Sequence, residues 1–492
     1  MPRFFYVIVA FLLVAVILSF GYSGLGEAGS PGVTIEVNWV SYSTGFSYTI
    51  RLCSLGDYLY VVGSRGGPPD TMWVVEARSK VNGSLVKTWT FNPTNLTDAP
   101  LDCIAFDNKL YIVGYENLHP DPRIPSDSRW SIVVLDPNLN LLKYISYNPS
   151  PYGDSAEGIT SDGQQLYVVG SIDFTVSKVQ AGEEYYLVEI RDPVTLDVVK
   201  SLRLRGDVTK AGFNDVTGEL WVVGFTRRSS NILVTIISRD LERFKTTMLP
   251  VEGLLCRGLA FDREGNAYIS CKLGVSIAKL SSNGTLIKST ITYPLRPGVD
   301  FQGVSVGLYK DYVVLAGSKF DVDRKYKHAI RILDGNLTTV TEKILEPGLD
   351  YDNAYLEGMV LEGNKAYLVG LLEKGQSVIA VVVYSITINT QTAIEKTVTQ
   401  TITVTSTTTI TQTIVARETV TQTIIKTQEQ TITRTQEKTV TYRETVTVEK
   451  TITTTEQQKP NLRNLLAGTI IGVIIGIATA TPIILLTRKQ KA

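Results

Sequence analysis

The chain has 492 residues, and its 48 lysines and arginines balance its 48 aspartates and glutamates. We expect no nucleic-acid partner, because binding to phosphates depends on an excess of basic residues. Two histidines and four cysteines, without a Cys-x-x-Cys or a pair of histidines, leave little material for imidazole catalysis or a zinc site.

The N-terminal segment has the layout of a secretory signal peptide. Arg3 provides a positive charge, Phe4–Phe20 is an apolar run, and Gly26-Glu27-Ala28 is a small-x-small cleavage site. The apolar run is long for a signal peptide, so an uncleaved membrane anchor remains the alternative. We therefore assign residues 1–28 to a signal peptide or N-terminal anchor.

One apolar pattern recurs seven times and is the strongest signal in the sequence. Examples are Tyr58-Leu-Tyr-Val-Val-Gly63 and Leu166-Tyr-Val-Val-Gly170. The last residues of the seven copies are Gly63, Gly114, Gly170, Gly224, Cys271, Gly317 and Gly370, at spacings of 51, 56, 54, 47, 46 and 53 residues. Repeats of roughly 50 residues, rich in Val, Ile and Tyr and punctuated by Gly, Asp and Asn, are typical of β-propeller blades.

Each copy, called here unit 1 to unit 7 in chain order, divides into four expected strands, A to D. Strand B is the recurring pattern, strand A precedes it as in Arg257-Gly-Leu-Ala-Phe-Asp262, and strand D begins with apolar residues and a lysine as in Leu141-Leu-Lys143. Unit 7 lacks a strand D, whereas residues 33–42 form a spare strand. We therefore predict an all-β fold, a seven-bladed β-propeller of four-stranded blades over residues 33–390. The N-terminal strand completes its last blade and leaves no open sheet edge.

Residues 33–390 resemble Kelch-like propellers, whose blades of about 50 residues carry a Leu-Tyr-Val-Val-Gly-Gly strand. Every unit here lacks the second glycine, and the residues in its place are Ser64, Tyr115, Ser171, Phe225, Lys272, Ser318 and Leu371. The resemblance implies the fold but not a function, since propellers serve as enzymes, lectins and scaffolds. The whole layout is also similar to archaeal membrane-anchored surface proteins, with a globular head on a Thr-rich stalk.

The four cysteines form two candidate disulfides. Cys53 and Cys103 occupy the same place in strand A of adjacent units, and Cys256 and Cys271 flank the A–B hairpin of unit 5. Two disulfides suit an exported protein, whereas four buried thiols are the alternative.

Candidate binding residues lie in the B–C loops and D–A segments, which share one face of a propeller. Long loops on a rigid scaffold are where binding usually resides. The candidates are His119, Asp121 and Arg123 in unit 2, Asp321, Asp323 and Tyr326 in unit 6, and the acidic residues Asp102, Glu157 and Glu357. We expect the acids to ring the channel mouth and attract a cation, with calcium as a candidate, or a polyhydroxyl ligand. The alternative is that aspartate simply favours turns. Both histidines, His119 and His328, are expected in exposed loops, and we assign no catalytic residue and no metal ligand set.

Four Asn-x-Ser/Thr sequons, at Asn82, Asn95, Asn283 and Asn336, are candidate N-glycosylation sites. Three of them fall in expected C–D turns, and only Asn95 falls in a D–A loop. This asymmetry favours the C–D side as the side nearer the membrane.

The segment from residue 391 to 460 is rich in threonine and has a period of two. Val, Ile and Tyr take even positions with only two exceptions, Val415 and Ile425, and threonine takes mostly odd ones. This period predicts an extended stalk. A coiled coil is the alternative, because the sequence Thr-Val-Thr-Gln-Thr-Ile occurs twice at an interval of 22 residues, which is two elevens. An isolated strand must pair with other chains or be kept extended by O-linked sugars.

The apolar run 465–487 has the length of a membrane-spanning helix. The basic tail 488–492 predicts a cytoplasmic C-terminus and places everything upstream outside the cell. The small residues Gly468, Gly472, Gly476 and Ala480 recur every four positions and favour helix association, although glycine is also simply common in such helices.

We therefore expect a single-pass cell-surface protein whose propeller binds a surface glycan or protein ligand through its membrane-distal face. An extracellular enzyme acting on polysaccharide or carrying a redox cofactor is one alternative, and a structural envelope component is another. A homo-oligomer formed through the stalk and the membrane helix fits the same pattern. No cofactor other than calcium is suggested.

Overall fold

The computed structural model describes residues 32–119, 127–175, 183–226, 230–291, 300–375 and 377–390, and the backbone of 395–404 and 432–441. Every regular element in these residues is a β-strand, which confirms the all-β prediction. None of them forms a helix that is long and apolar enough to cross a membrane. The signal peptide or anchor expected at 1–28, the helix expected at 465–487 with its row of small residues, and the tail 488–492 lie outside the described residues.

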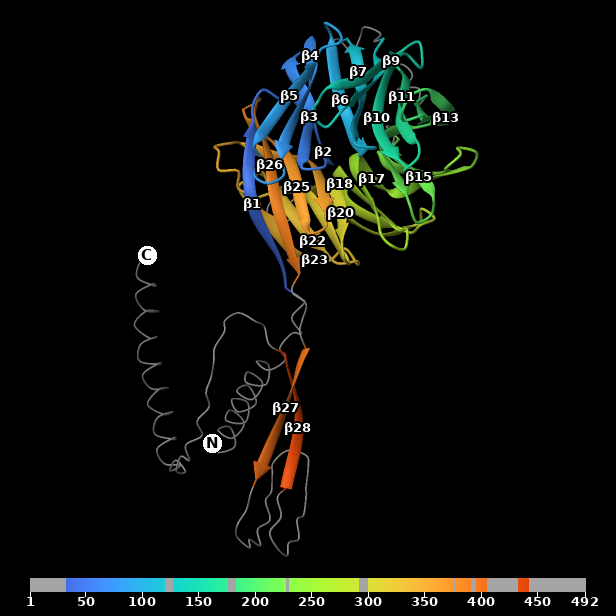
Figure 1. Cartoon of the computed structure of the whole chain (residues 1–492). Helices are drawn as coiled ribbons and strands as arrows, with labels where there is room; N and C mark the ends of the chain where they lie inside the picture. Colours follow the sequence, from blue (N-terminus) through green and yellow to red (C-terminus); the bar gives the residue numbers. More distant parts are fainter. Residues whose placement is uncertain are drawn as a thin grey trace, which may run out of the picture. The chain divides into compact units, whose positions relative to one another are not determined.

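The strands of each unit follow one another as antiparallel neighbours (Figure 1). Unit 1 holds β2 (Tyr48–Leu55), β3 (Tyr58–Gly67), β4 (Asp70–Ser79) and β5 (Leu85–Phe91). Unit 2 holds β6 (Thr97–Phe106), β7 (Lys109–Leu118), β8 (Arg129–Leu135) and β9 (Leu141–Tyr147). Unit 3 holds β10 (Gly153–Ser161), β11 (Leu166–Phe174), β12 (Tyr185–Arg191) and β13 (Val198–Arg205).

The later units follow the same plan with two longer strands. Unit 4 holds β14 (Asp207–Asn214), β15 (Glu219–Phe225), β16 (Asn231–Ser238) and the first part of β17 (Phe244–Phe261). Unit 5 holds the rest of β17, with β18 (Ala267–Leu280) and β19 (Leu286–Ile291). Unit 6 holds β20 (Phe301–Tyr309), β21 (Tyr312–Phe320), β22 (Tyr326–Leu333) and β23 (Thr339–Ile344). Unit 7 holds β24 (Asn353–Glu362), β25 (Lys365–Lys374), β26 (Ser377–Thr390) and the N-terminal strand β1 (Val33–Ser43).

The first strands of the units form a closed ring. Strand β2 contacts β6, and the contacts continue in the order β6, β10, β14, β17, β20 and β24, which contacts β2 again. The hydrophobic core lies between neighbouring sheets: Trp130 and Val113 of unit 2, for example, pack against Ile159 and Val168 of unit 3. This arrangement of sheets around a common centre is that of a β-propeller.

The prediction of seven separate four-stranded sheets is wrong at two places, because the head contains five sheets. Units 1 and 2 share an eight-stranded sheet, since β4 and β6 meet in one parallel pair, Thr71 with Thr97. Units 4 and 5 share a six-stranded sheet, since β17 pairs with β16 through residues 244–252 and with β18 through residues 253–261. Only three sheets of the head have four strands.

The N-terminal strand β1 completes the sheet of unit 7 and is bound on both sides. It pairs with β26 from Val33 opposite Thr390 to Ser43 opposite Val381. From unit 6, Lys343 Nζ donates to Ile35 O at 2.9 Å. From unit 1, the buried Arg78 donates to Tyr42 O at 2.9 Å and forms a 2.8 Å ion pair with Glu76. Strand β1 therefore joins three neighbouring units.

The recurring tyrosine of strand B and lysine of strand D have a structural role that explains their repetition. The hydroxyls of Tyr60, Tyr111 and Tyr167 donate to Pro137 O, Pro193 O and Arg239 O at 2.7, 2.9 and 3.1 Å. The ammonium groups of Lys87, Lys143 and Lys245 donate to Asn138 O, Thr195 O and Asn283 O. Each acceptor lies in the C–D turn of the next unit, so these side chains fasten neighbouring units together.

Residues 393–492 form a second compact unit. Within it, β27 (Glu395–Val404) and β28 (Ile432–Thr441) pair antiparallel from Glu395 opposite Thr441 to Val404 opposite Ile432. The backbone is extended there, as the period of two predicts, but the strand finds its partner within the same chain. Odd positions pair with odd positions, so threonine lies opposite threonine in three pairs, Thr397 with Thr439, Thr401 with Thr435 and Thr403 with Thr433. Among the even positions, only Val404 and Ile432 pair two aliphatic residues.

Candidate functional site in the central cavity

Several inner strands of the ring contain β-bulges, and each bulge changes the direction in which nearby side chains point. The register shifts between Ala156 and Gly158, Cys256 and Gly258, and Leu356 and Gly358 leave Glu157, Arg257 and Glu357 unpaired. A bulge bends its strand and redirects a side chain, and bulges are common next to functional sites. Three charged residues from three units are thereby placed at the bulges around the centre.

The recurrence of glycine at the end of the strand B pattern is explained by its contact with strand A. A Cβ atom on Gly170 would lie 2.1 Å from Ser155 O, and one on Gly224 would lie 1.7 Å from Asp207 O. The strand B glycine is therefore required by the close approach of the strand A carbonyl and not by a turn.

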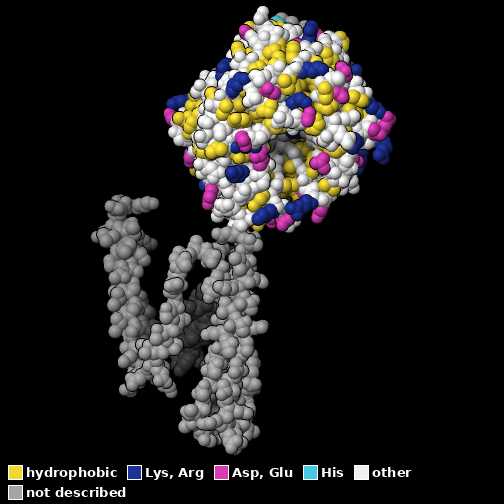
Figure 2. All heavy atoms as spheres, viewed as in Figure 1, with side chains coloured by type: hydrophobic (Ala, Val, Ile, Leu, Met, Phe, Trp, Pro, Cys, Tyr) yellow, Lys and Arg dark blue, Asp and Glu magenta, His cyan; other side chains and the backbone are white. Residues whose placement is uncertain are grey.

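A cavity of about 90 Å³ lies at the centre of the ring. Its charged lining residues are Arg51, Asp102, Glu157, Lys210, Arg257 and Glu357. They come from β2, β6, β10, β14, β17 and β24, so six of the seven inner strands contribute one each. Figure 2 shows the head hollowed near its middle in this view, with acidic and basic side chains around the hollow. The volume suits several water molecules or one small polar ligand, and it excludes a polymer chain.

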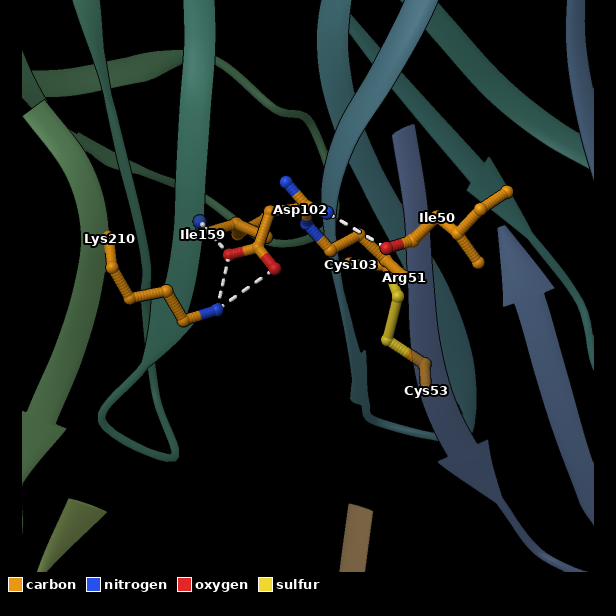
Figure 3. Close-up of a disulfide and its surroundings, with 7 residues drawn as sticks. All are labelled: Ile50, Arg51, Cys53, Asp102, Cys103, Ile159 and Lys210. Carbon is orange, nitrogen blue, oxygen red and sulfur yellow. Dashed lines mark hydrogen bonds and ion pairs between the residues drawn. A yellow bond between two sulfur atoms is a disulfide. The ribbon is translucent and has the colours of Figure 1, made fainter. Parts of the chain in front are cut away.

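Asp102 is neutralised by a lysine two inner strands further along the ring. Lys210 Nζ lies 2.7 and 2.9 Å from its two carboxylate oxygens, and Ile159 N donates to the carboxylate at 3.2 Å (Figure 3). The Cys53–Cys103 disulfide joins β2 and β6 immediately beside this ion pair (Figure 3). Both charges are more than half buried, so Asp102 is a fixed counter-ion of Lys210.

Glu357 is neutralised by two cations. Arg257 Nη1 lies 3.2 Å and Lys272 Nζ 2.9 Å from its carboxylate oxygens. The Glu357 side chain is 7% exposed, so this cluster carries one more positive than negative charge in a mostly buried place.

Arg51 and Glu157 complete the cavity. Burial, and next the charge of Arg257, lower the pKa of the Arg51 guanidinium to about 10, against the attraction of Asp102, Glu357 and Glu157. Burial, with a contribution from Asp207, raises the pKa of the Glu157 carboxyl to about 7, against a Ser155 hydrogen bond of 2.6 Å and the charges of Arg257 and Arg51. Both side chains keep some contact with solvent in the cavity. Glu157 is therefore close to half protonated at neutral pH.

A row of aromatic rings leads from a B–C loop to this cluster. The ring centroids of Phe320 and Tyr326 lie 5.1 Å apart, and those of Tyr326 and Tyr355 lie 5.0 Å apart. Lys272 Nζ sits 4.7 Å from the centroid of Tyr355 and reaches Glu357. All three rings are half-buried and present surface to solvent.

The structure brings together four of the nine predicted binding residues. Asp102, Glu157 and Glu357 line the cavity, and Tyr326 connects to it through the aromatic row. The acids do not form an open acidic ring, because two of them are neutralised by Lys210, Arg257 and Lys272.

The other predicted binding residues lie elsewhere. Asp321 and Asp323 lie in the β21–β22 turn, with their carboxylates 2.6 and 3.6 Å from Lys327 Nζ. His119 follows the end of β7, and Asp121 and Arg123 fall outside the described residues. Within the described ranges, no group of three or more His, Cys, Asp or Glu residues is arranged to hold a metal ion.

Sequence reasoning missed the cations of the cavity, although a signal for one of them was present. Arg257 precedes Gly258 as Glu157 precedes Gly158 and Glu357 precedes Gly358. The column before this glycine therefore carries charge of both signs, and counting only the acids concealed the pairing.

His328 corrects a second expectation, because it is fully buried in β22 rather than exposed in a loop. Its ring nitrogens lie 2.9 Å from Tyr384 OH and 3.1 Å from Leu371 O. Burial lowers the pKa of His328 to about 4, so the ring is neutral and structural at physiological pH.

Acidic residues at the start of the inner strands β6 and β10 organise loops. Asp98 accepts hydrogen bonds from Thr94 N, Thr94 Oγ1 and Asn117 N, and Asp154 accepts the equivalent bonds from Ser150 N, Ser150 Oγ and Asp173 N. Burial raises the pKa of each carboxyl to about 6. For these two residues the turn-forming interpretation of the acidic D–A segments applies.

Both candidate disulfides are present, and the four sequon asparagines are exposed. Cys53 bonds to Cys103, and Cys256 bonds to Cys271 on the strand opposite. Asn82, Asn95, Asn283 and Asn336 are exposed in connections between strands.

Comparison with known proteins identifies no family for this chain. No family model and no curated protein matches the sequence. Among solved structures, the RRP9 WD40 repeats match with a TM-score of 0.47 and 12% identity, over 72% of this chain and 100% of that one. The Neurospora crassa Pan2 WD40 domain matches at 0.47 and 11%, over 71% and 95%. A subtype N10 neuraminidase-like protein of A/little yellow-shouldered bat/Guatemala/060/2010 matches at 0.40 and 8%, over 72% and 100%. The propeller assignment therefore rests on the strand topology of this chain itself.

Proposed function

We propose that this chain is a cell-surface recognition module whose propeller head binds a glycan or protein ligand through the face that carries the B–C and D–A loops. The observation that carries this proposal is the aromatic row Phe320, Tyr326 and Tyr355, which ends at Lys272 and Glu357. Tyrosine combines an apolar ring with a hydrogen-bonding tip, which suits surfaces that bind polar ligands. The charged centre of the ring supplies hydrogen-bonding groups next to the row.

The orientation of the head supports the choice of face. Val33 pairs with Thr390, so both ends of the head leave from the side of the C–D turns. Phe320 ends β21 and Tyr326 begins β22, so both lie at the B–C loop, on the side opposite the C–D turns. In this proposal, the membrane-anchored segment follows residue 390 and the aromatic row points away from the membrane.

We further propose that the head has seven blades. The closed ring of seven inner strands supports this count, with the eight-stranded and six-stranded sheets counted as two blades each. A Kelch-like relationship, an archaeal surface layout, a single-pass membrane anchor and an oligomeric stalk are parts of the same proposal. The two disulfides, one of which links units 1 and 2, suit an extracellular head.

The test is a binding screen of the purified protein against envelope glycans and polysaccharides, with and without calcium. We expect Tyr326→Ala and Tyr355→Ala to weaken binding by about tenfold or more, which is typical of aromatic contacts near the centre of an interface. The matched control is Phe244→Ala, which removes a 52% exposed ring from the outer strand β17.

Equal losses in the control and the two tyrosine variants would refute the proposed face. Release of a product from any bound polysaccharide would instead place the protein among extracellular enzymes. Absence of binding and turnover would favour a structural role in the envelope.

A further inference from the structure

Three cations and three carboxylates line the central cavity, but Arg51 and Glu157 take no part in its ion pairs among the described residues. Asp102 is matched by Lys210, and Glu357 is shared by Arg257 and Lys272. The side chain of Arg51 has one hydrogen bond within the described residues, from Nη1 to the carbonyl of Ile50 at 2.8 Å. Its charge therefore has no carboxylate within ion-pair distance among those residues.

Arg51 and Arg257 line the same small cavity and repel each other. The charge of Arg257 is the largest electrostatic contribution that lowers the pKa of Arg51. Thr209 and Ser305 also line this cavity, from β14 and β20. The Thr209 hydroxyl donates to Cys256 O at 2.7 Å, so the groups that remain for a small oxyanion in about 90 Å³ are the two guanidinium groups and the Ser305 hydroxyl.

The carboxylate of Glu157 would compete with a bound anion for the two arginines. Glu157 lines the cavity, and the positive charges of Arg51 and Arg257 stabilise its ionised carboxylate. The titratable and charged groups around it are Arg51 of β2, Asp102 of β6, Tyr115 of β7, Asp207 and Lys210 of β14, Arg257 of β17 and Glu357 of β24. Of these, Lys210 and Asp102 neutralise each other, and Glu357 is shared by Arg257 and Lys272, so protonation of Glu157 leaves no carboxylate of the cavity to balance the charge of Arg51.

We propose that the central cavity is a binding site for one small oxyanion of the carboxylate or sulfate class, held between Arg51 and Arg257 and displaced when Glu157 is ionised. The site lies beside the inner end of the aromatic row, at Glu357, and is too small for a glycan chain. Its occupancy rises as the pH falls through the range in which Glu157 takes up a proton. A protonated Glu157 also donates a hydrogen bond to the bound ion.

The test is calorimetric titration of the full-length protein in detergent with sulfate, at constant ionic strength with chloride as the reference ion. Sulfate is suitable because its charge is constant between pH 6 and pH 8. The fraction of protonated Glu157 rises from about one tenth to about nine tenths between pH 8 and pH 6 for a pKa near 7. We therefore expect one saturable site with affinity about tenfold higher at pH 6 than at pH 8.

Two variants separate this site from general attraction of anions. Glu157→Gln removes the competing charge, so the affinity at pH 8 should equal that at pH 6. Arg51→Gln should lower the affinity at least tenfold at both pH values, whereas Arg51→Lys should retain part of it. The matched control, Arg243→Gln, alters an exposed arginine in a surface cleft beside Arg239 and Lys200 and should leave binding unchanged.

The absence of saturable sulfate binding in the wild-type protein would overturn the proposal. So would an unchanged pH dependence in Glu157→Gln, or a loss in Arg243→Gln as large as that in Arg51→Gln. If Arg51→Gln does not fold, Glu157→Gln and Arg51→Lys still decide the question. Glycan binding by the aromatic face is measured separately, so failure here leaves the proposed function open to its own test.

Discussion

The glycine that ends the strand B pattern is required by the close contact between strands A and B. Gly170 has no turn to form, but the carbonyl of Ser155 occupies the space that a side chain would need. Packed interiors accept little added volume, because neighbours cannot move without losing their own contacts. The same constraint recurs at Gly114, Gly224 and Gly317.

Replacing Gly170 with alanine should therefore destabilise the head by about 2–4 kcal/mol, since a backbone carbonyl must shift. The matched control is Gly335→Ala, because a Cβ there would meet nothing within 4 Å. Urea unfolding of both variants measures the difference. An unfolding free energy of Gly170→Ala within about 0.5 kcal/mol of the wild-type value, on the scale of an ordinary surface change, would contradict this explanation.

The pH dependence of stability should contain a separable contribution from His328. Its pKa is about 4 in the folded protein and 6.5 in the reference state, so folding favours the neutral ring. This contribution is fully present above pH 6.5 and is lost as the pH falls from 6.5 to 4, by about 3 kcal/mol in total. The change in unfolding free energy between pH 7 and pH 4.5 should be smaller in His328→Gln than in the wild type.

Asp98 and Asp154 act in the opposite direction, because burial raises their pKa values to about 6. Folding then favours the protonated acids, so their contribution increases stability as the pH falls from above 6 towards 4. Asp98 and Asp154 are present in both the wild type and His328→Gln, so their contributions cancel in the comparison. An identical pH profile for wild type and His328→Gln would show that His328 titrates normally.

Neighbouring elements are held together by side chains that reach the next C–D turn. The Tyr111 hydroxyl donates to Pro193 O at 2.9 Å, and Lys143 donates to Thr195 O in the same turn. A strand B tyrosine in one unit thus determines the position of a turn in the following unit. Repetition of the pair explains why three successive tyrosines occupy the same place in the repeat.

Tyr111→Phe should lower the unfolding free energy by about 1 kcal/mol, the usual net value of a hydrogen bond whose acceptor is left behind. Tyr309→Phe is the matched control, because no hydrogen bond of the Tyr309 hydroxyl occurs among the described residues. Chemical denaturation at neutral pH is the measurement. Equal effects of both changes would show that the contact with Pro193 contributes nothing specific.

Closure of the ring is a property of the whole molecule and depends on β1. This strand pairs with β26, accepts Lys343 from unit 6 and is bound by Arg78 of unit 1. Without it, β26 would expose an unpaired edge and Arg78 would lose buried partners.

A chain that begins at residue 44 should therefore lose more than about 4 kcal/mol of stability or unfold without cooperativity. A chain that begins at residue 29 keeps β1 and should behave as the wild type. Addition of a peptide with residues 33–43 should restore part of the loss by strand addition. Equal thermal unfolding midpoints of the two chains would show that the ring does not need its N-terminal strand.

The sequence by itself determined the all-β content, the repeat spacing, the spare strand 33–42 and the neighbouring places of the cysteines. These features are local or periodic, and a period of two and a spacing of about 50 residues are visible in one chain. It also indicated Asp102, Glu157, Glu357 and Tyr326 as candidates, since they lie where inner strands and loops begin.

Only the tertiary structure decided how those residues are used. Asp102 meets Lys210 from more than 100 residues away, and Arg257 meets Glu357 at a distance of 100 residues along the chain. The bulges that turn Glu157 inward and the burial of His328 likewise depend on neighbouring sheets. Ring closure juxtaposes charges that have no relation in sequence, so their pairing, and the lack of an ion pair at Arg51 among the described residues, could be found only in three dimensions.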